Sequence, residues 1–268
     1  MQYKKLILPL LLLINLCQFA FAQRAEIGIN AGGAGYIGDL NQFNPVKISG
    51  LNAGIYGKVN FTPYWGLGLH FNYGEIKADD ALSTNAEFRQ RNLNFKTSIA
   101  ELAIIGSFNF IDIYSPVSRK RVSPYLFAGF GGMTFRSTIK YNNEWVPSFA
   151  LRDYRTEGQA EPYKNYSIVI PYGAGVKYKK SENWTLFGQL GYRTTFTDYL
   201  DDVSGVYPLA PATWGGLNLS DRSGEIGNIG TPLYKPGDQR GDFRKFDTYL
   251  FVNIGITYTF VSQKCFTF

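Results

Sequence analysis

Residue types that could support catalysis are scarce in this chain. Among its 268 residues there is one histidine, His70, and there are two cysteines, Cys17 and Cys265. A Ser-His-Asp arrangement needs a histidine beside a nucleophile, and a zinc centre needs several His, Cys or carboxylate ligands. No pair of carboxylates has a spacing that singles it out for glycoside chemistry. We therefore expect no enzyme, no catalytic residue, no metal site and no cofactor.

Three short motifs bear on this expectation. Gly33–Gly38 matches the G-x-G-x-x-G pattern, but the residues after it have no helical period and soon reach Pro45, so a dinucleotide site is not expected. Asp198, Asp201 and Asp202 form an oxygen-rich group without the EF-hand spacing, which we interpret as a solvated loop base; whether it binds Ca²⁺ stays open. Arg240–Asp242 is an adhesion tripeptide too short to carry weight.

The first segment has the features of a secretory signal. Lys4 and Lys5 precede the apolar run Leu6–Leu16, and Ala20–Ala22 is an A-x-A cleavage site. We expect residues 1–22 to be removed and residues 23–268 to form one domain. Removal of the two lysines lowers the net charge from +6 to +4. The basic residues are scattered, so we expect no nucleic-acid partner, and no small-molecule substrate is evident.

Repeated period-two alternation is the strongest structural signal. Leu67, Leu69, Phe71 and Tyr73 fall on one face of an extended segment, and His70 and its polar neighbours fall on the other. Similar segments, each long enough to cross a bilayer as a tilted strand, recur along the chain. They lie at about 25–33, 51–61, 64–73, 101–110, 123–136, 167–179, 183–196 and 246–260.

The connections and the strand ends favour a membrane barrel. Short connections alternate with long polar ones at about 34–49, 76–93, 137–166 and 197–245. Such a rhythm is typical of an eight-stranded antiparallel transmembrane β-barrel with short periplasmic turns and long extracellular loops. Aromatic residues near the expected periplasmic ends fit an interfacial girdle: Phe61, Tyr64, Phe110, Tyr114, Tyr178, Trp184, Tyr258 and Phe260. We predict this all-β fold in the outer membrane, in contact with its lipid, with a soluble secreted β-protein as the alternative.

Eight strands leave an interior just wide enough for side chains. The inward positions are expected to carry a polar network, with His70, Asn72, Glu101, Asn109, Lys177, Gln189, Arg193 and Asn253. Charges in so narrow a space must be paired, so we predict that Glu101 pairs with Lys177 or Arg193. The network is either a stabilising plug or the lining of a selective pore.

Several segments resemble a known family. Residues 91–102, the Gly38–Leu40 start, the 61–65 turn, residues 197–203 and 219–225, and the late Cys265 are similar to the PorG-like outer-membrane proteins of Bacteroidetes. The resemblance implies an accessory or scaffold role in type IX protein secretion and gliding, with the periplasmic PorK and PorN ring as partner. The basic turn Arg119, Lys120 and Arg121 is a candidate periplasmic contact. A narrow pore or purely structural barrel is the alternative, and an outer-membrane enzyme is a third hypothesis.

Overall fold

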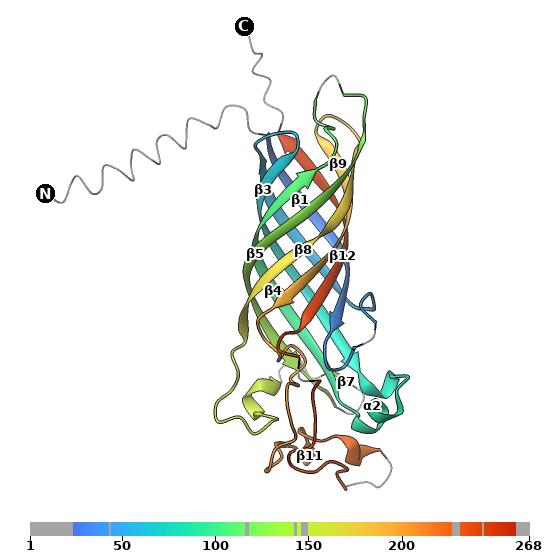
Figure 1. The fold of residues 1–268 in the computed structure, drawn as a ribbon, viewed down its shortest axis with the longest axis vertical. Helices are drawn as coiled ribbons and strands as arrows, with labels where there is room; N and C mark the ends of the chain where they lie inside the picture. Colours follow the sequence, from blue (N-terminus) through green and yellow to red (C-terminus); the bar gives the residue numbers. More distant parts are fainter. Residues whose placement is uncertain are drawn as a thin grey trace, which may run out of the picture.

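The structure is a computed structural model that describes residues 24–42, 44–115, 118–141, 144–145, 150–226, 231–242 and 244–260. The expected signal peptide, residues 1–22, and Cys265 lie outside these residues. The described chain forms one closed barrel with a group of long connections at one end (Figure 1).

Eight long strands form the barrel, each antiparallel to its neighbour, and β1 pairs with β12 to close the ring. The predicted fold class is thereby confirmed as a closed antiparallel eight-stranded barrel. The strands are β1 (Arg24–Ile37), β2 (Ile48–Asn60), β3 (Trp65–Asp79), β4 (Asn94–Asn109), β5 (Val122–Thr138), β8 (Tyr166–Lys179), β9 (Trp184–Thr195) and β12 (Thr248–Phe260).

The long connections carry only short elements. They lie at the end of the barrel where β7, α2 and β11 are labelled in Figure 1, opposite the short turns. These elements are η2 (Asp80–Leu82), α2 (Ala86–Arg91), β6 (Lys140–Tyr141), β7 (Glu144–Trp145), η3 (Leu151–Tyr154), β10 (Thr213–Trp214), β11 (Leu217–Asn218) and η4 (Ser223–Glu225). Within the described residues, no helix has the length and apolar character needed to cross a membrane.

The outer surface of the barrel carries a belt of apolar side chains. On β3, Leu67, Leu69 and Phe71 stand outward between Trp65 and Tyr73, each about half exposed. Eight residues of strand tilted by about 40° rise about 21 Å along the barrel axis, close to the apolar band of about 25 Å on transmembrane barrels. The predicted facing of this segment is the observed one.

Beyond this belt the polarity of the two faces reverses. Past Tyr73, Ile76 is completely buried inside, while Lys77 is exposed. On the neighbouring strand, Phe95 is buried inside, while Lys96 lies outside and pairs with Glu75 at 2.8 Å. The part of the barrel next to the long connections is therefore polar outside and apolar inside, as in a soluble protein.

This reversal explains why some of the predicted strands were too short. The sequence predicted one strand ending at residue 73 and the next beginning at residue 101, whereas β3 ends at Asp79 and β4 begins at Asn94. The alternation continues through both extensions, but with apolar residues at the inward positions. A search for one continuous apolar face misses such a change of phase, so the predicted loops at 34–49 and 76–93 were too long.

The aromatic girdle at the end with the short turns is present, with one exception. Phe61, Tyr64, Phe110, Tyr178, Trp184 and Phe260 are exposed, and Tyr258 is half-buried. The prediction for Tyr114 was wrong, because this residue is only 5% exposed. The Asp112 carboxylate accepts hydrogen bonds from the backbone N–H groups of Tyr114 (2.8 Å) and Ser115 (3.0 Å), which turns the chain back on itself.

The β4–β5 turn that carries Tyr114 also reaches across the barrel end. Arg24 Nη1, at the start of β1, donates a hydrogen bond to the carbonyl oxygen of Tyr114 at 2.5 Å. Because β1 and β5 are four strands apart in either direction around the ring of eight, this contact spans the opening. Ile113 is completely buried beside it. The turn thus covers this end of the lumen.

Candidate functional site

The lumen next to the covered end contains a buried ion pair. Lys58 Nζ lies 2.7 Å from Glu26 Oε2, and Asn60 Nδ2 donates to Glu26 Oε1 at 2.7 Å. Lys177 Nζ donates to Asn109 Oδ1 at 2.7 Å. The predicted network omitted the Glu26–Lys58 pair, although both residues occupy inward positions of alternating segments, a signal that was available in the sequence.

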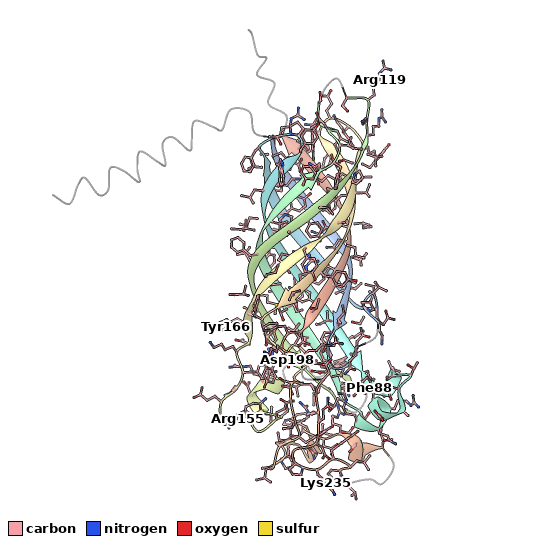
Figure 2. All side chains as sticks on the ribbon, in the orientation of Figure 1. Phe88, Arg119, Arg155, Tyr166, Asp198 and Lys235 are labelled. Carbon is pink, nitrogen blue, oxygen red and sulfur yellow. The ribbon has the colours of Figure 1, made fainter. Side chains whose placement is uncertain are left out.

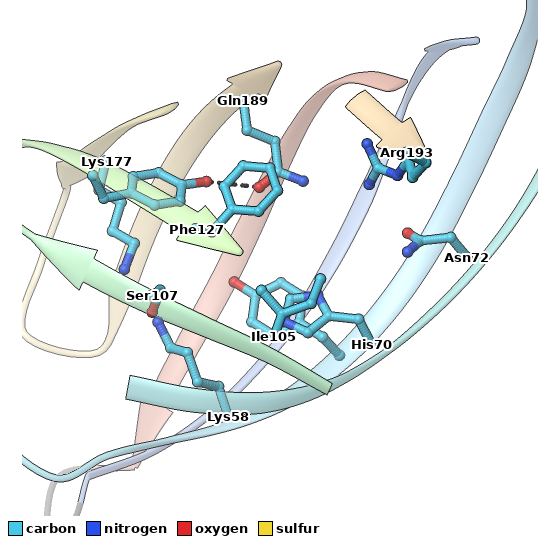
Figure 3. A pocket seen from close by; sticks show the side chains of 11 residues that line it. Lys58, His70, Asn72, Ile105, Ser107, Phe127, Lys177, Gln189 and Arg193 are labelled. Atoms are coloured by element: carbon cyan, nitrogen blue, oxygen red, sulfur yellow. Dashed lines mark hydrogen bonds between the residues drawn. The ribbon is translucent and has the colours of Figure 1, made fainter. Parts of the chain in front are cut away.

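A small cavity lies in the middle of the lumen. Its volume is about 30 Å³, room for about two water molecules, and Lys58, His70, Lys177 and Arg193 are among the residues that line it (Figure 3). The His70 ring stacks on Tyr56 with centroids 4.6 Å apart. Within the described residues, no hydrogen bond joins His70 to a hydroxyl or carboxyl side chain.

A second ion pair crosses the lumen on the side of this cavity that faces the long connections. Arg193 Nε lies 3.3 Å from Glu101 Oε2, and both side chains are almost completely buried. Asn72 Nδ2 donates to Glu101 Oε1 at 2.9 Å, and Tyr249 Oη donates to Oε2 at 2.6 Å. Of the two partners expected for Glu101, Arg193 is the one in contact, whereas Lys177 belongs to the polar group next to the covered end, where it donates to Asn109.

An apolar core fills the lumen at the end with the long connections. Residues of six strands contribute to it, and two residues of the longest connection, Leu200 and Val203, complete it with exposures of 0% and 1%. The core consists of Ala34, Tyr36, Leu40, Ile76, Ala78, Leu93, Phe95, Ile99, Met133, Phe135, Val169, Leu200, Val203, Tyr249 and Phe251. The connection after β9 therefore enters the barrel and seals it.

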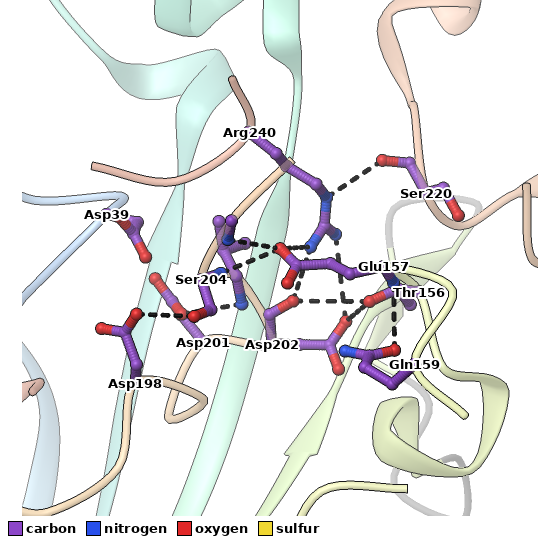
Figure 4. Close-up of polar contacts among 12 residues, drawn as sticks. Asp39, Thr156, Glu157, Gln159, Asp198, Asp201, Asp202, Ser204, Ser220 and Arg240 are labelled. Carbon is purple, nitrogen blue, oxygen red and sulfur yellow. Dashed lines mark hydrogen bonds and ion pairs between the residues drawn. The ribbon is translucent and has the colours of Figure 1, made fainter. Parts of the chain in front are cut away.

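Two buried arginines join the long connections into one cap. Arg240 Nη1 donates to Glu157 Oε1 at 3.0 Å and to the carbonyl oxygen of Asp202 at 2.6 Å (Figure 4). Arg91 pairs with Asp80 at 2.7 Å and donates to the carbonyl oxygens of Arg240 and Asp39. Because Arg240 is only 3% exposed, the Arg240–Asp242 tripeptide does not present its guanidinium to a partner.

The three aspartates grouped in the sequence have separate roles. Asp202 accepts hydrogen bonds from Thr156 and Tyr163 and lies 3.9 Å from Arg240. Asp201 accepts a hydrogen bond from the Tyr36 hydroxyl. Only Asp198 belongs to a carboxylate cluster, which it forms with two residues from elsewhere in the chain.

These two residues are Asp39 and Asp247, neither of which was expected from the sequence. Carboxylate oxygens of Asp39, Asp198 and Asp247 all lie within 4.8 Å of one another. Burial raises the pKa of Asp39 to about 8 and that of the half-buried Asp198 to about 6. Burial, followed by the charge of Asp39, also raises the pKa of Asp247 well above its usual value. The signal in the sequence was positional, because each residue lies directly beyond the outer end of β1, β9 or β12, which are adjacent in the ring.

The basic turn lies at the opposite end of the molecule. Arg119, Lys120 and Arg121 are all exposed in the β4–β5 connection (Figure 2). The caps at the two ends therefore differ in character: one is a short basic turn, and the other is a packed assembly of long connections with buried carboxylates.

Comparison with solved structures finds small barrels at low sequence identity. Ail, the attachment invasion locus protein of Yersinia pestis, is 12% identical, with 89% of this chain and 99% of that chain covered and a TM-score of 0.40. A major outer membrane protein from Thermus thermophilus is 13% identical, with 89% and 100% covered and a TM-score of 0.39. The N-terminal β-barrel domain of Pseudomonas aeruginosa OprF is 13% identical, with 88% and 97% covered and a TM-score of 0.37.

Comparison with protein families is more specific. No curated protein matches the chain. One family model, described as a domain of unknown function (DUF6089), matches residues 4–221, which include seven of the eight barrel strands. The chain belongs to the DUF6089 family.

Proposed function

We propose that this protein is a non-catalytic outer-membrane barrel that acts by binding, as an accessory or scaffold component of type IX protein secretion. The observation that carries the binding mode is the blocked lumen. The β4–β5 turn covers one end with the Glu26–Lys58 pair beside it, the Arg193–Glu101 pair crosses the lumen, and an apolar core fills the other end. With its interior filled, the barrel offers its turns and cap as working surfaces.

The outer surface supports the membrane location. Outward side chains such as Leu69, Ile104 and Ile254 are between 41% and 75% exposed. Leu69 and Ile104 lie on the adjoining strands β3 and β4, and Ile254 lies on β12, elsewhere in the ring. Apolar area of this extent is costly in water and is satisfied by lipid, while ring closure leaves no unpaired strand edge in the hydrocarbon. Density-gradient fractionation of cell envelopes tests this location, and recovery with soluble proteins would contradict it.

The alternative function is a narrow pore, which the polar lining of the central cavity favours. Lys58, Lys177 and Arg193 line this cavity and would select anions in an open channel. The two functions differ in planar lipid bilayers: a blocked barrel gives no steady current, whereas a pore gives reproducible single-channel steps. Single-channel steps would favour the pore if the same protein sample is shown to be folded by its heat-modifiable mobility on gels.

The secretion role rests on the resemblance to the PorG-like family and needs a partner surface. The basic turn is the best candidate, since Arg119, Lys120 and Arg121 are exposed at the end where β1 starts and β12 ends. Crosslinking and pull-down from envelopes should recover the periplasmic ring proteins with the wild type. Changing all three residues to Ala should abolish recovery.

A matched control removes positive charge at the other end of the barrel. Arg155 and Lys235 are exposed in the long connections (Figure 2), and their change to Ala should leave recovery unaltered. Loss of recovery in both variants would show a general effect of charge, and recovery of no ring protein by the wild type would refute the secretion role.

A further inference from the structure

The carboxylates of Asp39, Asp198 and Asp247 converge at the outer mouth of the barrel. They come from three places in the chain: just after β1, just after β9 and just before β12. Their oxygens lie within 4.8 Å of one another. One oxygen from each carboxylate is therefore near enough to the other two for all three to contact a single calcium ion at bond lengths of about 2.4 Å.

Each of the three carboxylates is held by a donor at one oxygen. Asp39 Oδ1 accepts the backbone N–H of Asp242, Asp198 Oδ2 accepts the Ser204 hydroxyl at 2.7 Å, and Asp247 Oδ2 accepts the backbone N–H of Leu200 at 3.0 Å. The second oxygens are left for another partner. Asp247 Oδ1 has only a 3.3 Å contact with the Tyr36 hydroxyl. Among the described residues, Asp39 and Asp198 each keep one oxygen without a hydrogen bond, and Asp247 keeps one with only this long contact, an arrangement that suits oriented metal ligands.

Asp39 gives independent evidence that a partner is missing. The residue is only 1% exposed, and its Oδ2 has no hydrogen-bond partner among the described residues. In Figure 4 the Asp39 carboxylate points toward the side of the cluster where Asp198 and Asp201 lie. A buried polar atom without a partner is costly, and such atoms are normally satisfied by protein, water or an ion.

No basic side chain neutralises this cluster within the described residues. Asp39, Asp198 and Asp247 form no ion pair with lysine or arginine there. The nearby arginines are engaged elsewhere, Arg91 with Asp80 and Arg240 with Glu157 and Asp202. Three carboxylates without a countercharge, at an outer mouth partly open at Asp198, form an attractive site for a cation.

We propose that Asp39, Asp198 and Asp247 bind one calcium ion at the outer mouth of the barrel. The ligands are all oxygen atoms, which suits a hard cation and does not favour zinc or copper. Because Asp198 is half-buried, water could reach the ion there and complete its coordination shell. Asp201 uses both of its oxygens for Tyr36 and the Val203 N–H, so it adds charge without serving as a ligand.

The ion would act as a structural clamp. It would join both ends of the connection between β9 and β12 to the connection after β1. The connection between β9 and β12 carries Leu200 and Val203, which complete the apolar core in the lumen. Calcium would therefore hold the cap in the barrel, and the proposal is independent of whether the protein takes part in secretion.

The direct test is calcium binding by the full-length barrel in detergent, refolded without lipopolysaccharide and stripped with EDTA. Isothermal titration should give one site per chain, with a dissociation constant at or below the range of about 10⁻⁴ to 10⁻³ M found for extracellular calcium modules. Terbium should bind in its place and emit on tyrosine excitation, because the Tyr36 hydroxyl lies 3.3 Å from Asp247 Oδ1. Hydrogen exchange around Leu200 should accelerate on addition of EDTA.

Single substitutions locate the site. D39N and D247N should each weaken binding by about tenfold or more, equivalent to about 1.4 kcal/mol or more. D153N is the matched control, because the Asp153 side chain is 61% exposed on another connection, and it should bind as the wild type does. Heat-modifiable gel mobility reports folding in each case. If a buried variant does not fold, D198N at the half-buried position decides.

Two results would overturn the proposal. One is the absence of calcium binding by folded wild type up to about 10 mM, beyond the weakest extracellular sites. The other is binding with equal affinity by wild type and the folded Asp39, Asp198 or Asp247 variants, which would place the ion elsewhere.

Discussion

Replacing Arg193 with methionine should strongly destabilise the barrel, because it leaves the Glu101 carboxylate buried without its cation. Arg193 is 1% exposed and Glu101 is completely buried. Asn72 and Tyr249 would still donate hydrogen bonds to Glu101, so the loss is mainly one of charge compensation. Methionine keeps most of the volume and the apolar contact with the Phe251 ring, over which the Arg193 guanidinium lies at 4.4 Å.

The size of the effect follows from the geometry. Two unit charges 3.3 Å apart attract by about 5 kcal/mol at an effective dielectric constant of about 20. Removal of one partner of a buried pair costs about 3 to 5 kcal/mol in practice. The control is Lys96→Met, which breaks the partly exposed pair with Glu75 and should cost about 1 kcal/mol or less.

Urea unfolding in lipid vesicles, followed by tryptophan emission, measures these free energies. The double variant Glu101→Gln with Arg193→Met should be more stable than the sum of the two single effects predicts, by about 2 kcal/mol or more, since it leaves no buried charge unpaired. A cost for Arg193→Met no larger than that for Lys96→Met, or strict additivity in the double variant, would refute the interpretation of a buried, coupled pair.

Three further predictions concern the belt, the apolar core and the cap. Leu69→Lys, midway along the apolar belt, should cost about 2 to 4 kcal/mol of unfolding free energy in vesicles, whereas Leu82→Lys, at a cap residue that is 78% exposed, should cost about nothing. Leu200→Ala should cost about 2 to 5 kcal/mol of local stability, measured as faster hydrogen exchange in the connection after β9 with unchanged exchange in mid-barrel strands. Arg240→Met should make the cap sensitive to trypsin, while Arg155→Met, at an exposed site, should not; equal sensitivity would contradict the role of Arg240 in joining the connections.

The part of the barrel whose strands carry the apolar belt could be predicted from the sequence. Each residue there alternates between an apolar outer surface and a narrow interior, so a period of two is visible in any short segment. The segment from Leu67 to Tyr73 and the segment from Val252 to Phe260 both have the facing that the pattern predicts, whereas Leu250, which the pattern places outward, is completely buried. The extensions of β3 and β4 were missed because the alternation changes phase where the outer surface becomes polar.

The inward position of Tyr114 shows a different limit. Its place near a strand end is typical of a girdle residue, but a hydrogen bond from its N–H to Asp112 reverses the chain and places the ring inside. The choice depends on the geometry of one turn, which residue type and spacing alone do not specify.

Sequence alone determined the number and direction of the strands, because alternating segments and the rhythm of short and long connections can be read along the chain. It also determined which side chains of the belt face outward, because that facing depends on neighbours one or two positions apart. Tertiary structure decided that the lumen is sealed by Leu200 and Val203 and that Asp39, Asp198 and Asp247 meet. These residues are far apart in the chain and are brought together only when β1, β12 and β9 become neighbours on closure of the ring. Contacts across a closed ring leave no local period in the sequence, so only the folded barrel reveals them.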